Sequence, residues 1–243
     1  MLGLISLSDE ERPPTNFGLL PPRSHRPIDL VVSMLIPFDH LFRKYAVKTD
    51  QVLHLGANTG QEAEAYDEQG ISRVIWVEAL LEVWVKLRQH IVRFPGHTAL
   101  LACLSDKDGE EVTFNVASND SQSSSFLEFG THSKEHPTVK FERIVEMTTV
   151  RLDTLLDREN IKIQMNGFLN ADLQGAELLA LKGMGDLLGR FRYAYIEVNE
   201  KELYQGCPLV GEIDDYLASF GFEGKEVKMT GAGWGDKFYM RRD

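Results

Sequence analysis

Short apolar segments of strand length alternate with amphipathic segments of helix length from residue 51 onward. The first three apolar segments are residues 51–55 (QVLHL), 73–78 (RVIWVE) and 97–104 (HTALLACL). The segments between them are residues 60–70 and 81–94, which have helical spacing and end at Gly70 and at Pro95-Gly96. Strands that alternate with helices at this spacing form a parallel sheet joined by right-handed crossovers. The pattern therefore predicts an α/β fold.

The alternation breaks between residues 105 and 150, where turn signals and a serine-rich loop indicate a β-rich insertion. Its strand candidates are residues 111–117 and 139–150. After a short helix at 152–160, the strand–helix pattern resumes with strands at 166–175 and 190–199 and helices at 176–189 and 209–221. The last two strands, 222–229 and 237–242, are separated by a turn too short to hold a crossover helix. We therefore expect a seven-stranded, mostly parallel sheet that ends in an antiparallel hairpin.

The first part of the chain differs from the rest because prolines are frequent in it. Residues 1–27 contain Pro13, Pro14, Pro21, Pro22 and Pro27, which predict an extended arm. Residues 28–46 are expected to hold one or two short helices, so the folded domain is expected to span 28–243. The apolar run 28–38 contains Asp29, ends near Pro37 and is too short to cross a bilayer. The first residues lack the basic region of a secretory signal.

Charge and cysteine content limit the partners and the compartment. The formal net charge is −11, from 37 acidic and 26 basic residues, which argues against a nucleic-acid-binding protein. Cys103 and Cys207 are too few for a disulfide framework, and a reducing cytoplasm is the simplest location. We expect no membrane partner, and we leave a homodimer open.

The first strand is followed by a glycine-containing turn, Gly56-Ala57-Asn58-Thr59-Gly60. Glycine permits positive φ and lets a ligand approach the backbone. Glu78 ends the second strand 22 residues after Gly56, close to the roughly 20-residue spacing of a carboxylate that binds a ribose. Because the G-x-x-x-G spacing lacks the second glycine of the dinucleotide fingerprint, one nucleoside without a pyrophosphate fits better. S-adenosylmethionine has this composition, and an NAD-dependent oxidoreductase is the alternative.

Several segments resemble the FkbM-type family of S-adenosylmethionine-dependent methyltransferases. They run in family order from about residue 50 to the C-terminus. The segments are VLHLGANTGQEA, VIWVEAL, LSDKDGEEVTF, NDSQSSSF, TTVRLDTLL, GFLNADLQGAELLALKGM and YIEVNEKELYQGCPLVGEIDDYLASFGF. The most distinctive part is DLQGAELLALKG. The resemblance implies the class I methyltransferase (Rossmann-like) fold and the cofactor S-adenosylmethionine.

The resemblance also implies which residues contact the cofactor. They are His54, Gly56, Ala57, Asn58, Gly60, Glu78, Ala79, Ser105, Asp106 and Asp172. Family members usually carry an acid at the position of His54, and a strand histidine bonded to backbone is the alternative role. Ser105 and Asp106 follow the third strand, where family members contact the adenine, although Asp106 also suits a turn.

Three polar residues at strand ends are the catalytic candidates, namely Asp172, Glu197 and Asn199. The resemblance places Asp172 beside the transferable methyl, where a carboxylate accepts the acceptor's proton or holds the cofactor's ammonium. The alternative is that Asp172 is the N-cap of the helix that begins near Gly175. Glu177 is interpreted as a favourable charge at a helix start. Glu197 and Asn199 are expected either to contact the acceptor or to have a purely structural role.

The segment His132-Ser133-Lys134-Glu135-His136 matches the H-x-x-E-H pattern of a zinc protease. It lies in the β-rich insertion, between Gly130 and Pro137, where a long helix is not expected. We therefore predict no metal site. The resemblance implies methyl transfer to a hydroxyl of a small molecule, natural product or sugar. A noncatalytic cofactor-binding or interaction domain of the same fold is the second alternative.

Overall fold

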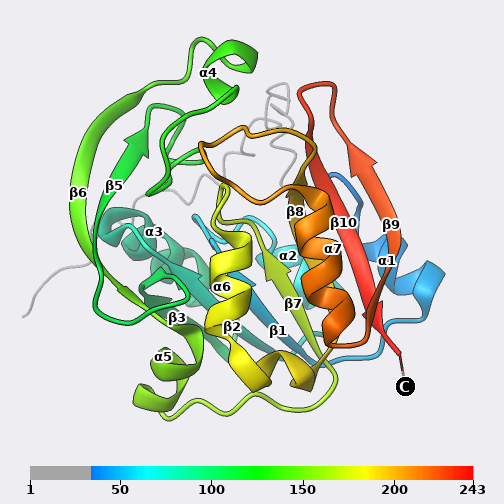
Figure 1. Ribbon diagram of the computed structural model, residues 1–243. Helices are drawn as coiled ribbons and strands as arrows, with labels where there is room; N and C mark the ends of the chain where they lie inside the picture. The colour runs from blue at the N-terminus through cyan, green and yellow to red at the C-terminus, as the bar shows by residue number, and fades with distance from the viewer. Residues whose placement is uncertain (1–33, 243) are drawn as a thin grey trace, which may run out of the picture. The chain divides into compact units, whose positions relative to one another are not determined.

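The computed structural model describes residues 34–242 (Figure 1). The expected proline-rich arm at 1–27, and residues 28–33 of the segment expected to hold short helices, lie outside the described residues. The rest of that segment contains one helix, α1 (Phe38–Tyr45). It begins directly after Pro37 and ends where Ala46 adopts the left-handed conformation.

A seven-stranded sheet with the order β3-β2-β1-β7-β8-β10-β9 forms the centre of the described part. Its strands are β1 (Gln51–Leu55), β2 (Arg73–Glu78), β3 (His97–Leu101), β7 (Gly167–Ala171), β8 (Phe191–Asn199), β9 (Phe222–Met229) and β10 (Trp234–Arg241). The first five are parallel to one another, and β10 is antiparallel to both β8 and β9. The predicted class I methyltransferase fold, with its C-terminal hairpin, is confirmed.

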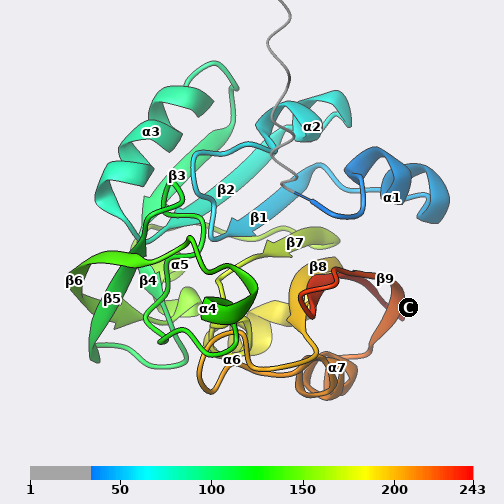
Figure 2. The ribbon, with the colours of Figure 1, turned by 90° about the horizontal axis from the view of Figure 1, so that it is seen from above.

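Helices cover both faces of this sheet (Figure 2). One face carries α1, α2 (Ala63–Glu68) and α3 (Leu81–Ile91). The other face carries α5 (Leu152–Arg158), α6 (Glu177–Gly183) and α7 (Val210–Ser219). Among residues 34–242, no helix is long and apolar enough to cross a membrane.

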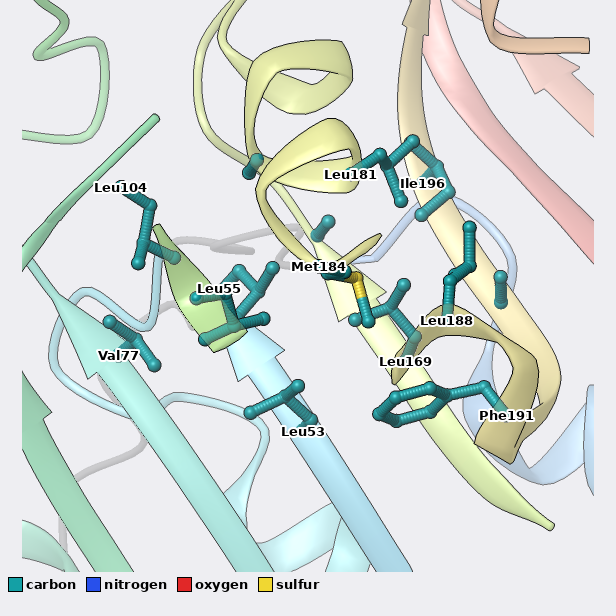
Figure 3. Packing of buried hydrophobic residues seen from close by; sticks show 14 of the residues in the cluster. Leu53, Leu55, Val77, Leu104, Leu169, Leu181, Met184, Leu188, Phe191 and Ile196 are labelled. Atoms are coloured by element: carbon teal, nitrogen blue, oxygen red, sulfur yellow. The ribbon is translucent and has the colours of Figure 1, made fainter. Parts of the chain in front are cut away.

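The alternation of side chains along the central strands explains why both faces are covered. Leu53 and Leu55 of β1 join the core under α5, α6 and α7, together with Leu169 and Ile196 (Figure 3). Val52, on the opposite face of the same strand, belongs to the core under α1 and α2. Every residue of β1 is therefore buried, as expected for a central parallel strand.

The predicted β-rich insertion is a separate three-stranded sheet with the order β4-β6-β5. Its strands are β4 (Cys103–Leu104), β5 (Glu111–Ala117) and β6 (Phe141–Val150). A short helix, α4 (His132–Glu135), lies between β5 and β6. The segment 97–104, expected to be one strand, is divided between the two sheets, because β4 pairs with β6 instead of continuing along β2.

Several other boundaries also differ from the sequence prediction, and two of these differences have a clear local cause. The helix expected at 176–189 ends at Gly183, and a 3₁₀ helix, η1 (Gly185–Arg190), follows it. Gly185 has φ +51°, outside the α-helical region, which explains the interruption. Strand β10 begins at Trp234, three residues earlier than predicted, because the chain reverses within residues 230–233 with Gly233 at φ +84°.

Candidate functional site

The residues expected to bind ligands lie largely along one edge of the sheet. Gly56 follows β1, Glu78 ends β2, Asp172 follows β7, and Glu197 lies near the end of β8. These four strands are parallel, so their carboxyl ends meet at the same edge. We call it the carboxyl edge, with a cofactor half at β1 and β2 and an acceptor half at β7 and β8.

Gly56 is at the point where the two halves touch. Its φ is +79°, and a Cβ at this position would lie 1.8 Å from the backbone oxygen of Asp172. The amides of Gly56 and Ala57 both donate to the carbonyl of Val77, at 3.0 Å. The position therefore requires glycine, and the loop after β1 is held directly against the residue that follows β7.

The rest of the loop is fixed by local hydrogen bonds. Asn58 has φ +43°, and its side-chain oxygen accepts the amide of Thr59 at 2.7 Å. Gly60 has φ +77°, and a Cβ there would lie 2.7 Å from the Leu87 side chain. Helix α2 begins at Ala63, three residues after the start of the segment 60–70 that was predicted to be helical. The loop thus has a single defined shape beside the end of β2.

Glu78 holds this loop through backbone amides. One carboxylate oxygen accepts the amide of Asn58 at 2.9 Å, and the other accepts the amide of Leu80 at 2.8 Å. The carboxylate is buried, and burial raises its pKa to about 7. Each oxygen keeps a second lone pair, so Glu78 can still accept ligand hydroxyls. Ala79, between Glu78 and Leu80, is partly buried.

His54 is buried beneath the loop and bonds to a side chain, not to backbone as the alternative role assumed. Its Nδ1 lies 2.9 Å from the hydroxyl of Tyr66, which also accepts the side-chain amide of Asn170 at 2.8 Å. The ring stacks on Trp76, and Glu62 lies 4.0 Å from Nδ1. Burial lowers the pKa of His54 to about 3, so the ring is neutral near pH 7.

In the acceptor half, three carboxylates come together. One oxygen from each of Asp172, Glu177 and Glu197 lies within 4.8 Å of the other two. Glu177 and Glu197 are buried, and Asp172 is partly buried. Burial raises the pKa of all three carboxyls, that of Glu177 to about 7, and the negative neighbours raise those of Glu177 and Glu197 further.

The structure excludes the alternative role of Asp172 and adds to the interpretation of Glu177. Asp172 is not a helix N-cap, because α6 begins at Glu177, its N-cap residue is Ala176, and no side chain caps it. Glu177 is more than a favourable charge at a helix start. It is fully buried, and one of its oxygens accepts the amides of Leu173 and Gly175, at 2.8 and 3.1 Å.

Gln174 connects the cluster and was missed by sequence reasoning. Its side-chain nitrogen donates to Asp172 at 2.5 Å and to Glu197 at 3.0 Å. Its side-chain oxygen accepts the hydroxyl of Tyr204 at 2.6 Å. Gln174 has φ +52°, which is uncommon for a residue other than glycine. The glutamine in DLQG was visible in the sequence, but its distant partners were not.

Asn199 is the last residue of β8 and pairs with Trp234 of β10. Alternate residues of a strand share a face, so Asn199 lies on the same face as Glu197. It is 1% exposed, and neither polar atom of its side chain has a hydrogen-bond partner among the described residues. A buried amide in this condition is destabilising unless a ligand satisfies it.

Ser105 and Asp106 make hydrogen bonds to residues outside the glycine loop. They follow β4, and the amide of Ser105 donates to the carbonyl of Val150. The backbone oxygen of Ser105 lies against Gly183, the last residue of α6, and that of Asp106 accepts the guanidinium of Arg151. Gly183 is about 9 Å along the helix from Glu177, since each residue rises about 1.5 Å. The backbone of Ser105 therefore lies at the opposite end of α6 from Glu177.

Two segments meet near the carboxyl edge, residues 119–136 of the insertion and residues 200–207 after β8. We call them the covering segments. The amides of Gly130 and His132 donate to the carbonyl of Leu203, and Phe129 pairs with Tyr204 as an antiparallel bridge. Through Tyr204, the covering segments reach Gln174 and the carboxylate cluster. The serine-rich loop of the sequence is part of this cover.

The H-x-x-E-H match occupies the short helix α4 in the cover. His132 stacks on Phe129 at 4.2 Å between ring centroids, and its Nε2 lies 3.2 Å from the hydroxyl of Ser123. Glu135 accepts Lys201 at 2.5 Å. The two histidine rings are 4.9 Å apart, but the glutamate is engaged elsewhere. These side chains therefore serve aromatic packing and an ion pair.

Similar proteins were found among curated proteins and among solved structures. A curated relative, the 2-O-methyltransferase NoeI of Sinorhizobium fredii, is 23% identical over 176 residues, covering 70% of this chain and 71% of NoeI. A SAM-dependent methyltransferase from Aquifex aeolicus has a TM-score of 0.46 at 12% identity, covering 87% of this chain and 93% of that one. Fibrillarin from Aeropyrum pernix with bound S-adenosyl-L-methionine has a TM-score of 0.40 at 12% identity, covering 79% and 66%.

The family comparison covers most of the chain. Residues 54–223 match the model described as the methyltransferase FkbM domain. The match includes the glycine loop, Glu78 and the carboxylate cluster, as the resemblance had indicated. The chain belongs to the FkbM family of methyltransferases.

Proposed function

We propose that the protein transfers a methyl group from S-adenosylmethionine to a hydroxyl oxygen of a small molecule, natural product or sugar. One observation carries the proposal. Gly56 of the cofactor half approaches the backbone of Asp172 so closely that no side chain fits between them. A cofactor bound along the loop of Gly56 to Gly60 would therefore have the carboxylate cluster as its neighbour.

The cofactor half suits the nucleoside. Glu78 is buried at the end of β2, and its free lone pairs would accept the two ribose hydroxyls. The loop from Gly56 to Gly60 would approach the methionine part. We keep His54, Ala79, Ser105 and Asp106 as proposed cofactor contacts, although His54, Ser105 and Asp106 also hydrogen-bond to other residues.

The acceptor half suits a hydroxyl. In the reaction a bond forms between the acceptor oxygen and the methyl carbon while the carbon–sulfur bond breaks, and the hydroxyl proton must leave. Asp172 and Glu197 supply carboxylate oxygens to receive it. The sulfonium is already a strong methyl donor, so alignment of the acceptor is the protein's main task.

The relatives favour oxygen over nitrogen. NoeI is named as a 2-O-methyltransferase, and its similarity covers 70% of this chain. The alternative of an NAD-dependent oxidoreductase loses support because the chain belongs to a methyltransferase family. A noncatalytic domain is one possible outcome of the experiment below. A homodimer stays open.

The test is methyl transfer from S-adenosylmethionine labelled in the methyl group. The full chain is incubated with separate pools of monosaccharides and glycans, phenols, secondary alcohols and amines, and labelled products are identified by mass spectrometry and NMR. We expect an O-methyl ether from the hydroxyl pools that is lost in Asp172→Asn. N-methylated products would contradict the proposal. Cofactor binding without transfer to any pool or to a cell extract would favour a noncatalytic domain.

A further inference from the structure

The carboxylate cluster is assembled from three separate elements of the fold. Asp172 follows β7, Glu177 begins α6, and Glu197 lies near the end of β8. One oxygen from each lies within 4.8 Å of the other two. Three like charges this close repel each other strongly where water is largely excluded. Such a group needs a positive partner or shared protons.

No basic side chain provides that partner in the part of the chain that the structure describes. Among residues 34–242, Lys237 pairs with Asp214 and Lys201 with Glu135, and no ion pair of these residues reaches the cluster. The side-chain amide of Gln174 donates to Asp172 and Glu197, but it is neutral. Buried charges without a counter-charge are typical of sites that coordinate metal ions.

A second observation points to a ligand. Glu177 is 0% exposed, and its Oε1 accepts two backbone amides while its Oε2 has no hydrogen-bond partner. Asn199, two residues beyond Glu197 on the same face of β8, also has both polar atoms buried and unpartnered. Native proteins rarely leave such atoms unsatisfied. An oxygen-binding ligand at the cluster would satisfy the carboxylate.

We propose that Asp172, Glu177 and Glu197 bind one divalent cation of the magnesium, manganese or calcium kind. Carboxylate oxygens are the preferred ligands of these hard cations. Oxygens on opposite sides of the ion are about 4.0–4.2 Å apart around Mg²⁺ and about 4.6–5.2 Å apart around Ca²⁺, from twice the metal–oxygen distance. One oxygen from each carboxylate lies within 4.8 Å of the other two, so they are no farther apart than opposite ligands of a Ca²⁺ ion can be.

The cation would define the acceptor more closely, and this step rests on the proposed function. Three protein ligands leave about three positions of an octahedral ion for other oxygens. An acceptor with two neighbouring oxygens, such as the vicinal hydroxyls of a sugar, would fill two of them. The cation would hold one of these oxygens in line with the methyl group.

The first measurement tests binding alone. The full chain is freed of metal with a chelator and titrated with Mn²⁺, followed by electron paramagnetic resonance, and with Mg²⁺ and Ca²⁺, followed by calorimetry, without cofactor or acceptor. We expect one saturable ion per chain. Failure of all three ions to bind at millimolar concentration would overturn the proposal, whether or not the chain transfers methyl groups.

Matched variants locate the ion. Glu197→Gln and Glu177→Gln should each weaken Mn²⁺ binding by at least about tenfold, the scale for disturbing a metal site. Glu142→Gln removes the same charge from an exposed position of β6 and should leave binding unchanged. Because Glu177 also holds backbone amides, Glu197→Gln is the decisive variant if Glu177→Gln does not fold. Unchanged binding in Glu197→Gln would place the ion elsewhere and overturn the proposal.

Gln174→Glu adds a carboxylate to the cluster, whereas the variants above each remove one. A fourth carboxylate beside Asp172 and Glu197 should lower the melting temperature in chelator, and added Mn²⁺ should restore it and bind more tightly than to the wild type. Binding of S-adenosylmethionine should persist in chelator. If the variant is destabilised and no ion restores it, the cluster is neutralised by protons or by the cofactor's own ammonium, and the proposal fails.

Discussion

Glu78 and Glu197 are both buried glutamates near the ends of parallel strands, but their surroundings differ. Glu78, in the cofactor half, accepts two backbone amides that are fixed by the turn after β1 and by the start of α3. Glu197, in the acceptor half, accepts one side-chain amide and faces two other carboxylates. The glutamate of the cofactor half therefore has hydrogen-bond donors on both oxygens without a ligand. The acceptor half instead holds three neighbouring carboxylates, whose negative charge a ligand would neutralise.

Because of this difference, we expect mutations in the two halves to have different consequences. Changes in the cofactor half should alter the loop, cofactor affinity and stability together, because the same hydrogen bonds serve all three. Changes in the acceptor half should alter turnover, with smaller effects on cofactor affinity. The predictions below test this division, from the largest expected effect to the smallest.

The largest effect is expected at the contact between the halves. Gly56→Ala would place a Cβ 1.8 Å from the backbone oxygen of Asp172, at φ +79°. We expect a loss of at least about 3 kcal/mol in the free energy of unfolding, or no folded protein. Gly70→Ala has a similar φ of +75° with nothing within 4 Å, and should cost only about 1–2 kcal/mol. Urea denaturation compares the two, and equal losses would refute the close contact.

The next effect concerns turnover in the acceptor half. Asp172→Asn should lower the rate of methyl transfer by roughly 10²–10⁴, because an amide is a poor proton acceptor and a poor cation ligand. Cofactor affinity should change by less than about tenfold. Asp157→Asn removes a carboxylate from an exposed position of α5 and should be fully active. Steady-state kinetics decide the matter, and full activity of Asp172→Asn would remove it from the acceptor site.

A pH effect is expected from Glu78. Its pKa is raised by burial from 4.5 to about 7, so between these values the folded chain keeps a proton that the unfolded chain releases. The free energy of unfolding should therefore fall as pH rises from about 4.5 to 7, by on the order of 2–3 kcal/mol from this group. Cys103, a titratable neighbour, has its pKa raised to about 12 and stays neutral in this window.

Glu78→Gln isolates this contribution, because glutamine cannot titrate. The free energies of unfolding of the wild type and the variant will differ by a pH-independent amount, from the changed amide contacts, and by a pH-dependent amount, from the titration of Glu78. Denaturation at several pH values should show the stability of the wild type falling relative to the variant between pH 5 and 7. Parallel pH profiles would mean that Glu78 is ionised throughout and that its burial costs little.

The smallest effect is expected at the cover. Tyr204→Phe removes the hydroxyl that donates to Gln174 at 2.6 Å, and should lower stability by on the order of 1 kcal/mol. If the covering segments position the acceptor, KM for the acceptor should rise more than kcat falls. Tyr45→Phe, which loses a hydroxyl contact with Glu226 away from the carboxyl edge, should change stability without changing KM. Equal kinetic effects would show that the cover has no such role.

The sheet was predictable because its strands are apolar runs between strong turn signals. Strands β1, β2, β5 and β9 have the predicted bounds. The errors are where one apolar run serves two sheets, at residues 97–104, and where Gly185 interrupts a helical pattern. Hydrophobic periodicity predicts the local conformation of a segment, but it does not predict with which strand that segment will pair.

The candidate site was only partly predictable, for a related reason. Gly56, Glu78 and Asp172 were found because strand ends converge in this fold. Tyr204 was not, because its contact with Gln174 joins residues that are 30 positions apart across two loops. Glu177 does begin a helix as predicted, but its full burial was not predicted, because a glutamate at a helix start is ordinarily on the surface. Burial of a polar residue is a property of the whole fold.

The central claim is that the cofactor half alone binds the nucleoside part of the donor. Calorimetric titration of S-adenosylhomocysteine, in chelator, into the wild type, Glu78→Gln and Asp172→Asn tests it most directly. We expect Glu78→Gln to weaken binding by on the order of 1–3 kcal/mol and Asp172→Asn to bind nearly as the wild type does. Wild-type binding in Glu78→Gln together with lost binding in Asp172→Asn would contradict the claim, and would assign Asp172 to the cofactor's ammonium.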